Sequence, residues 1–322
     1  MSSSRRFGRT DLIVLAVVAI WGVNLSVVKS AISGPGAPFT PFAFNALRFV
    51  VASSALLLML RWTGDEVPTS RRDWLAVLGI GLLGNTLYQA LFITGVDHTS
   101  PANSELIAAT TPVIVALIGA ALRIEKLGAL AWIGVGMSFA GVAVIVLGNT
   151  SGAPGAPRAS SLVGDAIILS AAVVWAIYTM LVASLLRRYS ATTITALSVT
   201  AGTVLIVIMA LPELGRLDWG AVSPAAWSAA GFSGLLALAV GYAGWNRGVK
   251  AIGSARTAVY SNMIPIAAAL FAWLGRGDPI TVYHVIGAAV VLTGINLTRL
   301  GRQAPEYLYR GQARPDGLPV EE

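Results

Sequence analysis

Cysteine is absent from the 322-residue sequence, and histidine occurs only twice, at His98 and His284. The lack of cysteine excludes disulfide bonds, thiolate nucleophiles and cysteine-ligated metal sites. Neither histidine belongs to an HExxH or other paired metal-ligand spacing, and the sequence has no G-x-S-x-G nucleophile elbow. The sequence shows no arrangement of a nucleophile, a base and an orienting group that is typical of an enzyme active site. The sequence therefore predicts a protein that is not an enzyme and that uses no cofactor or metal.

Charged residues are scarce as well. They make up 11% of the chain, against about 25% in a soluble domain. Hydrophobic residues make up 56%, and the mean hydropathy is +0.74, so we expect a surface that faces lipid. The formal net charge of +7 does not indicate nucleic-acid binding, because the basic residues stand singly or in pairs at the ends of apolar runs.

Ten apolar stretches follow one another, each of roughly 20 residues, the length of a helix that crosses about 30 Å of hydrocarbon. They lie at Leu12–Ala31, Pro41–Leu60, Trp74–Ile93, Pro101–Leu122, Leu127–Leu147, Leu162–Leu186, Thr192–Leu211, Ala225–Asn246, Ala255–Leu274 and Ile280–Leu297. The connections are short and rich in Gly, Pro or charge, so no soluble domain fits between them. The sequence predicts an all-α integral membrane protein with ten transmembrane helices in the lipid bilayer.

The first half of the chain recurs in the second half at an offset of 153 residues, without a gap. Gly81-Leu82-Leu83 returns as Gly234-Leu235-Leu236, Pro112 returns as Pro265, and Gly134 and Gly141 return as Gly287 and Gly294. Because each half has five spans, an odd number, the second repeat is inverted in the membrane relative to the first. Inverted repeats are typical of transporters, which bind their solute near the middle of the membrane between the two halves.

The distribution of basic residues orients the chain. Most of the 22 Lys and Arg fall on the side of the N-terminus, and the loops on the opposite side hold only Arg158, Arg216 and Arg276. This bias predicts a cell (inner) membrane protein with both termini in the cytoplasm. We expect a cytoplasmic N-terminal segment at residues 1–10, five-helix repeats at residues 11–149 and 150–302, and a disordered, Pro-rich cytoplasmic tail at residues 303–322.

The N-terminus admits another interpretation. Ser4-Arg5-Arg6-Phe7 resembles part of a twin-arginine signal that precedes an apolar run. That run is about as long as a full membrane span, however, and its Trp21 and Asn24 have counterparts in the second half. We therefore interpret it as a permanent first transmembrane helix.

Polar and aromatic residues inside the spans indicate a central cavity, because such residues are costly in lipid and usually functional. Asn85, Tyr88, Gln89 and Phe92 share one helical face, with the spacing i, i+3, i+4, i+7. The alternative for the aromatic residues is a belt at the membrane surface. The expected solute-binding residues are Trp21, Asn24, Asn85, Tyr88, Gln89, Phe92, Thr111, Trp175, Tyr178, Tyr242, Trp245, Tyr260 and Asn262. This lining suits a small, partly apolar or aromatic solute held by stacking and a few hydrogen bonds.

Two prolines occupy equivalent places near the middle of the fourth and ninth spans. Pro112 and Pro265 each remove one helical hydrogen bond and free the carbonyl four residues earlier, at Ala108 and Ser261. In lipid these carbonyls need a partner or a water-lined cavity. The prolines are therefore either packing kinks or breaks in helices that line a cavity.

Three charged residues lie within the spans. Lys29 either snorkels to the outer surface or has a partner inside the protein. Arg48 lies about two turns into its span, where its partner must be internal. Glu105 either pairs structurally or carries a proton in a proton-coupled cycle.

These residues, taken together, resemble the EamA-type family of the drug/metabolite transporter superfamily. The resemblance rests on Trp21-Gly22, Asn24, Lys29, Ala46-Leu47-Arg48-Phe49, the two prolines and the glycine-spaced fifth and tenth spans, and it covers about residues 10–300. It implies two inverted five-helix bundles around a cavity lined mainly by spans one, three, four, six, eight and nine. It also implies export or exchange of small metabolites, amino acids being a common class, across a plasma membrane that is usually bacterial.

The chain departs from the family after spans four and nine, where members often carry Gly-Glu. Those places read Arg123-Ile124-Glu125 and Gly275-Arg276-Gly277-Asp278, so the family's loop details do not carry over.

The interpretation favoured by the sequence is a multi-pass transporter that exports amino acids or similar small solutes by alternating access. Its partners would be a small-molecule substrate and the bilayer, and the sequence leaves its oligomeric state open. The alternatives are an integral membrane enzyme acting on a lipid or isoprenoid substrate, and a channel. An enzyme would need clustered acid, base or metal ligands at one membrane face, which the sequence lacks.

Overall fold

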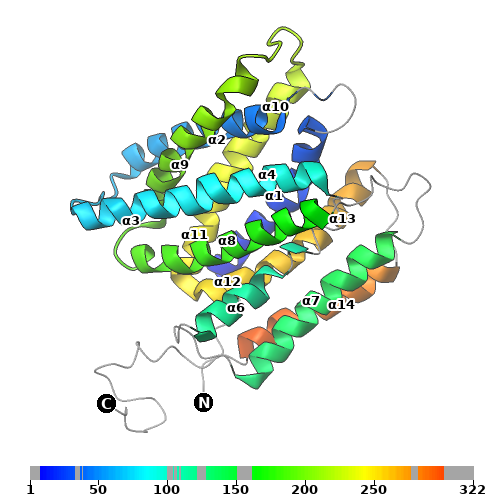
Figure 1. Cartoon of the computed structure of the whole chain (residues 1–322). Helices are drawn as coiled ribbons and strands as arrows, with labels where there is room; N and C mark the ends of the chain where they lie inside the picture. Colours follow the sequence, from blue (N-terminus) through cyan, green and yellow to red (C-terminus); the bar gives the residue numbers. More distant parts are fainter. Residues whose placement is uncertain are drawn as a thin grey trace.

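The computed structural model of the chain is a bundle of helices (Figure 1). It describes residues 8–32, 37, 39–99, 104, 107–108, 110–121, 128–150, 162–276 and 282–300. The first seven residues, the tail from residue 303 and Glu105 lie outside these ranges, so the expectations for them stay predictions.

Ten transmembrane segments form two inverted repeats of five, as the sequence predicted. The helices of the first repeat are α1 (Arg9–Ile32), α2 (Pro41–Thr63), the continuous segment α3 (Arg71–Gly81), η1 (Leu82–Leu87) and α4 (Tyr88–His98), then α6 (Thr111–Ala121) and α7 (Ala129–Thr150). Those of the second repeat are α8 (Leu162–Leu186), α9 (Ala191–Leu214), the segment α10 (Pro224–Phe232), η2 (Ser233–Val240) and α11 (Gly241–Ile252), the segment α12 (Ser254–Val259), η3 (Tyr260–Met263) and α13 (Ile264–Arg276), and α14 (Val282–Leu300).

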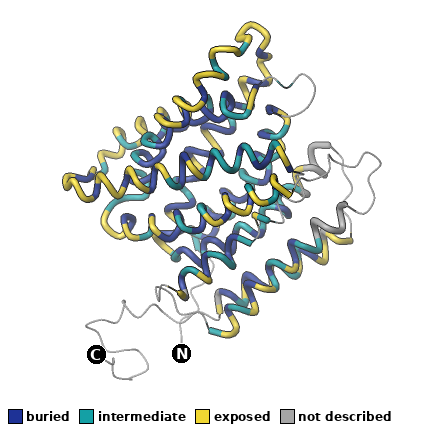
Figure 2. The backbone as a smooth tube through the Cα atoms, viewed as in Figure 1, coloured by how far each residue is buried: buried dark blue, intermediate teal, exposed yellow. Residues whose placement is uncertain are grey.

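The helices carry an apolar outer surface that fits lipid. Among the described residues, six helical segments are long and apolar enough to cross a membrane: Arg9–Ile32, Pro41–Thr63, Arg71–His98, Leu162–Leu186, Ala191–Leu214 and Pro224–Ile252. Figure 2 shows buried residues on the faces that the helices turn toward one another and exposed residues along the outside. The exposed side chains include Leu57, Leu58, Ile208 and Leu211, which in water would be a large unfavourable patch.

Local sequence signals explain where several helices begin. Ser70, Ser190 and Ser223 stand just before α3, α9 and α10, and each side chain accepts a hydrogen bond from the backbone N–H three residues on. Pro41 and Pro224 occupy the first position of α2 and α10, where a missing N–H costs nothing.

The third segment of each repeat contains a π-helical stretch at an equivalent place. η1 covers Leu82–Leu87 in the first repeat and η2 covers Ser233–Val240 in the second, and the repeat offset maps the whole of η1 onto the end of η2. π turns are rare and cluster at functional sites, because they rotate one helical face and release carbonyls from the regular pattern. The Ala237 carbonyl in η2 accepts a hydrogen bond from Trp21 Nε1 at 2.9 Å.

The two repeats interlock around a shared centre, because the first helix of each packs against the third segment of the other. α1 lies along α11 and α8 lies along α4, and Figure 1 shows the latter pair side by side. Glycines allow both contacts: a Cβ on Gly248 would come within 2.6 Å of Val14, and one on Gly95 within 2.6 Å of Ile168. The centre of the bundle is therefore built equally from both halves.

The last helices of the two repeats, α7 and α14, form an antiparallel pair along one edge of the bundle (Figure 1). Their backbones meet at glycines: a Cβ on Gly134 would lie 2.5 Å from the Gly294 carbonyl, and one on Gly141 would lie 2.7 Å from the Gly287 carbonyl. The repeat symmetry converts one of these contacts into the other. The seven-residue glycine spacing seen in the sequence thus serves close helix packing.

Candidate functional site

A cavity of about 140 Å³ lies at the centre of the bundle, between the repeats. Its walls come from α1, α2, α4, α8, η2, α11 and the segments before Pro112 and Pro265. The lining residues are Trp21, Asn24, Leu25, Arg48, Tyr88, Gln89, Phe92, Ser104, Ala108, Thr111, Ile168, Ala171, Ala172, Trp175, Ala237, Leu238, Tyr242, Ser261, Ile264 and Pro265. An engineered apolar cavity of about 150 Å³ holds one benzene molecule, so this space fits a small metabolite.

Aromatic rings form one wall of the cavity. The Trp175 ring lies at its centre, with ring-centroid distances of 4.8 Å to Tyr88, 5.2 Å to Tyr242 and 5.9 Å to Trp21. Trp245 stands behind this layer, 5.2 Å from Trp21 and 5.8 Å from Trp175. The rings are tilted or edge-on, arrangements that are favourable for aromatic pairs. They present apolar faces on which a planar or aliphatic solute can stack.

Polar groups converge on another side of the cavity. The Arg48 guanidinium donates from Nε to Asn45 Oδ1 at 2.8 Å, from Nη1 to Ser233 Oγ at 3.2 Å and from Nη2 to Gln89 Oε1 at 2.6 Å. Gln89 Nε2 donates in turn to the Tyr242 hydroxyl at 2.6 Å. Gln89 and Tyr242 occupy equivalent positions of the two repeats, so their mutual hydrogen bond places them at the symmetry axis.

Asn24 and Lys29 belong to α1, and both follow Trp21 toward the C-terminal end of that helix. The Lys29 amine donates to the Val96 carbonyl at 2.5 Å, so it joins α1 to α4 rather than only reaching for the membrane surface. Asn24 is buried and lines the cavity, and its Oδ1 has no hydrogen-bond partner among the described residues. A buried amide oxygen of this kind is available to a solute.

Ten of the predicted site residues line the cavity together. They are Trp21, Asn24, Arg48, Tyr88, Gln89, Phe92, Thr111, Trp175, Tyr242 and Pro265. Ala108 and Ser261, whose carbonyls the prolines free, line it as well. α6 begins at Thr111, just before Pro112, and the 3₁₀ turn η3 precedes Pro265, so the regular helix is interrupted at both places. The roles of these residues in solute binding stay predictions.

The remaining described site residues lie outside the lining. Tyr178 and Trp245 form a second layer behind the aromatic wall, where Asn246 Nδ2 donates to the Tyr178 hydroxyl at 3.1 Å and to Thr195 Oγ1 at 2.8 Å. Tyr260 donates to Asp11 Oδ1 at 2.5 Å. Asn85, Asn262 and Pro112 are buried in helix contacts away from the lining. Glu105 lies outside the described residues.

Sequence reasoning missed several groups that complete the site. Ser104 belongs to the lining, and Asn45 and Ser233 hold Arg48. The i, i+3 spacing of Asn45 and Arg48 could have identified the first partner. No local pattern identifies Ser233, because it lies 185 residues from Arg48.

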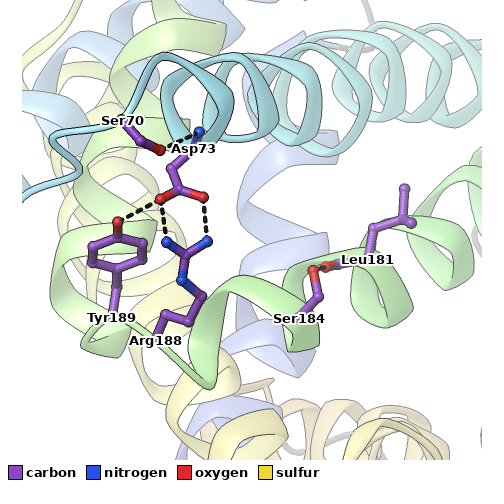
Figure 3. Close-up of polar contacts among 6 residues, drawn as sticks. All are labelled: Ser70, Asp73, Leu181, Ser184, Arg188 and Tyr189. Atoms are coloured by element: carbon purple, nitrogen blue, oxygen red, sulfur yellow. Dashed lines mark hydrogen bonds and ion pairs between the residues drawn. The ribbon is translucent and has the colours of Figure 1, made fainter.

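A polar cluster lies at one end of the bundle, where α2, α8 and α11 end and α3, α9 and α12 begin. We call this the basic end, because it carries Arg61, Arg71, Arg72, Arg187, Arg188, Arg247, Lys250 and Arg256. In Figure 3 the Asp73 carboxylate, on α3, faces Arg188 and Tyr189, between α8 and α9. Arg188 contacts Asp73 through both Nη atoms, with Nη2 donating to Oδ2 at 2.6 Å, and the Tyr189 hydroxyl donates to Oδ2 at 2.7 Å.

The cluster joins the first repeat to the second at this end. The Asp73 side chain is 3% exposed and that of Arg188 is 57% exposed, so the pair stands at the border between protein and solvent. The hydrogen bond to Asp73, together with partial burial, raises the pKa of Tyr189, so the phenol stays protonated and remains a donor at physiological pH. Lys250 adds a third element by donating to the Tyr189 carbonyl at 2.8 Å. We call Asp73, Arg188 and Tyr189 the latch.

The architecture and the cavity agree with the comparison to known families. The sequence pattern of the EamA-like transporter family matches residues 8–147 and again residues 162–300. The chain belongs to this family. The resemblance to the drug/metabolite transporter superfamily, inferred from the motifs of spans one and two, the two prolines and the glycine-spaced spans five and ten, is therefore confirmed, and the protein is a multi-pass membrane transporter.

Relatives of this EamA-like protein span nearly the whole chain. The "Uncharacterized transporter YyaM" of Bacillus subtilis (strain 168) is 27% identical over 278 residues, which are 85% of this chain and 90% of the relative. The "Probable terminal-alkyne amino-acid exporter" of Streptantibioticus cattleyicolor is 28% identical over 297 residues, 88% of this chain and 95% of the relative. A solved structure titled "Crystal structure of protein" has a TM-score of 0.72 at 21% identity and covers 90% of this chain and 96% of its own, which shows the shared fold.

Proposed function

We propose that this EamA-like transporter carries small organic solutes, amino acids or similar metabolites, through its central cavity by alternating access, with export as the net direction. The observation that carries the proposal is the cavity itself, which has an aromatic wall, a polar side and walls from both repeats. A site shared by two inverted halves can open to either side when the halves rock against each other. The relative named as an amino-acid exporter supports the solute class.

The position of the cavity supports a state that is closed at the basic end. Two layers lie between the cavity and that end: the buried Tyr178, Trp245 and Asn246, and then the latch. Other lining residues lie farther from the basic end along their helices: Leu25 follows Trp21 on α1, Phe92 follows Tyr88 on α4, and Ile168 precedes Trp175 on α8. With the basic end in the cytoplasm, as the positive-inside rule requires, the cavity would face outward and the latch would act as the cytoplasmic gate.

Counterflow in proteoliposomes tests the proposed function. Purified protein is reconstituted, loaded with an excess of one unlabelled solute, and diluted into a trace of the same labelled solute, for a panel of amino acids, organic acids, amines, nucleosides and sugars. A carrier accumulates label transiently above equilibrium, because the excess unlabelled solute inside competes with the entered label for the binding site and slows its exit. We expect such an overshoot for at least one small solute with an apolar body.

Other outcomes of the same experiment would contradict the proposal. A channel equilibrates the label without an overshoot, and an enzyme converts it to a product that chromatography separates. Absence of flux for the entire panel, with protein that remains folded in the vesicles, would also count against a small-solute carrier. Empty liposomes measure the leak in each case.

A further inference from the structure

The most deeply buried charge in the described part of the bundle belongs to Arg48, about two turns into α2. The residue is 1% exposed, yet it borders the central cavity. An arginine keeps its charge at physiological pH, and a buried cation is strongly unfavourable unless an anion accompanies it. The side-chain groups that accept hydrogen bonds from it, on Asn45, Ser233 and Gln89, are all neutral.

A counter-ion for Arg48 is missing from the described residues. Within 4.0 Å, the ion pairs seen in this part of the chain are those of Arg188 with Asp73 and of His98 with Asp97, both at the ends of helices. The ring of Phe44 lies 5.6 Å from the Arg48 guanidinium carbon, but a cation–π contact does not neutralise the charge. The described part of the protein thus buries a fixed positive charge beside the cavity without supplying its anion.

Arg48 keeps N–H donors that no described side chain accepts. A guanidinium has five N–H donors, and the hydrogen bonds to Asn45, Ser233 and Gln89 use three of them. Because one N–H remains on each Nη atom, a carboxylate in the cavity could accept a hydrogen bond from the guanidinium, which favours carboxylates as partners. The same three partners hold the guanidinium in place from α2, η2 and α4, so the donor pair is preorganised.

We propose that Arg48 binds the carboxylate of the transported solute, which is therefore a small monocarboxylate with an apolar or aromatic body. Trp21, Tyr88 and Trp175 would stack on that body while Arg48 fixes its acidic end. The inference rests on the proposed transport function and adds the chemical class of the solute. The inference also assigns a function to the polar side of the cavity in addition to its part in packing α2 against η2.

Matched pairs of acids and amides test this inference in the wild-type protein. Counterflow and thermal-shift measurements compare L-phenylalanine with L-phenylalaninamide, L-leucine with L-leucinamide, and 3-phenylpropanoate with 3-phenylpropanamide. The members of each pair have nearly the same shape and differ in the acidic group. We expect at least one acid to bind or exchange, with its amide at least tenfold weaker. The third pair, which has no amino group, reports whether an amine is required in addition.

Variants of Arg48 then assign the preference to this residue. Arg48→Gln should remove the advantage of the acid over its amide, and Arg48→Lys should keep part of it, because lysine keeps the charge but not the paired donors. Arg61→Gln serves as the control, since Arg61 is exposed at the end of the same helix. A merely structural arginine would lower the melting temperature on substitution without changing the acid-to-amide ratio.

The outcomes separate this inference from the proposed function. Equal handling of acids and amides by the wild-type protein, or exchange only of neutral or cationic solutes, overturns the role of Arg48 and leaves the carrier function intact. An acid preference that survives in Arg48→Gln also overturns it. If Arg48→Gln does not fold, the wild-type pairs and Arg48→Lys still decide. Failure of counterflow for the whole panel instead refutes the carrier function, on which the inference depends.

Discussion

Trp175→Ala is expected to abolish measurable counterflow and to lower solute affinity by about 30-fold or more. The Trp175 ring contacts Tyr88, Tyr242 and Trp21 and forms the middle of the aromatic wall. Replacing a buried tryptophan by alanine costs about 3–5 kcal/mol in a well-packed site, and 1.4 kcal/mol corresponds to about tenfold in affinity. Part of that loss falls on the fold, so we also expect a lower melting temperature.

Two further variants separate the loss of a stacking surface from general damage. Trp175→Phe keeps an aromatic ring and should retain a measurable fraction of solute affinity. Trp62→Ala should leave counterflow and melting temperature unchanged, because Trp62 is 77% exposed at the end of α2. Binding by isothermal titration, measured on folded protein, provides the affinity. Wild-type affinity in Trp175→Ala would show that this ring does not contact the solute.

Gly134→Ala is expected to destabilise the protein strongly, although it adds only one methyl group. The new Cβ would lie 2.4 Å from the Thr298 backbone nitrogen and 2.5 Å from the Gly294 carbonyl. These are backbone atoms of α14, so α7 and α14 must move apart. Overpacking of this kind costs about 1–3 kcal/mol, and the separated pair would lose additional contacts in the membrane, where small residues at the crossing allow close packing.

Position 136 offers a matched control on the same helix. A Cβ on Gly136 would meet no atom within 4 Å, so Gly136→Ala should be neutral, or slightly stabilising because alanine favours helix. Thermal unfolding in detergent, followed by fluorescence, compares both variants with wild type. Equal melting temperatures for Gly134→Ala and wild type would contradict the close crossing of α7 and α14.

The helices and their inverted arrangement could be predicted from the sequence because they depend on local signals. The Leu162–Leu186 span agrees with α8 at both ends, since an apolar run bounded by polar residues defines its own limits in lipid. The repeat of Pro112 as Pro265, and of Gly134 as Gly287, is visible without any structure. The odd number of spans per repeat then requires the inversion.

Contacts between distant residues could not be predicted in the same way. Tyr260 was expected in the cavity, but it donates to Asp11, which is buried at the start of α1 and needs a donor. Trp245, as an aromatic residue, could have formed part of a membrane-surface belt, and instead it is fully buried behind the aromatic wall. Each outcome depends on which helices become neighbours, and a single sequence does not give this.

The π-helical stretches were also beyond sequence reasoning. Nothing in the residues of Leu82–Leu87 or Ser233–Val240 signals a wider turn, because π geometry arises where packing outweighs regular hydrogen bonding. Gln89 and Tyr242, which follow the two stretches at equivalent positions, are hydrogen-bonded to each other. Ser233, at the start of η2, accepts a hydrogen bond from Arg48. The polar side of the cavity is thus a product of tertiary structure.

Labelling of a single introduced cysteine tests the central claim, which is one cavity that opens alternately to the two sides of the membrane. The chain has no cysteine of its own, so Ala172→Cys, in the cavity wall, would provide the single reactive thiol. A membrane-impermeant maleimide is applied to intact cells and to inverted vesicles. The experiment compares the protein with the latch intact to Asp73→Asn, in which the latch is opened. Arg72→Gln, which changes the exposed neighbour of Asp73, serves as the control. With the latch intact, we predict that the thiol is labelled from outside. In Asp73→Asn, we predict that labelling from the cytoplasmic side increases and that labelling from outside decreases in parallel. Cytoplasmic labelling that rises in Asp73→Asn while outside labelling stays unchanged would show a cavity open to both sides at once and would contradict alternating access. No change in labelling from either side would refute the role of the latch as the gate.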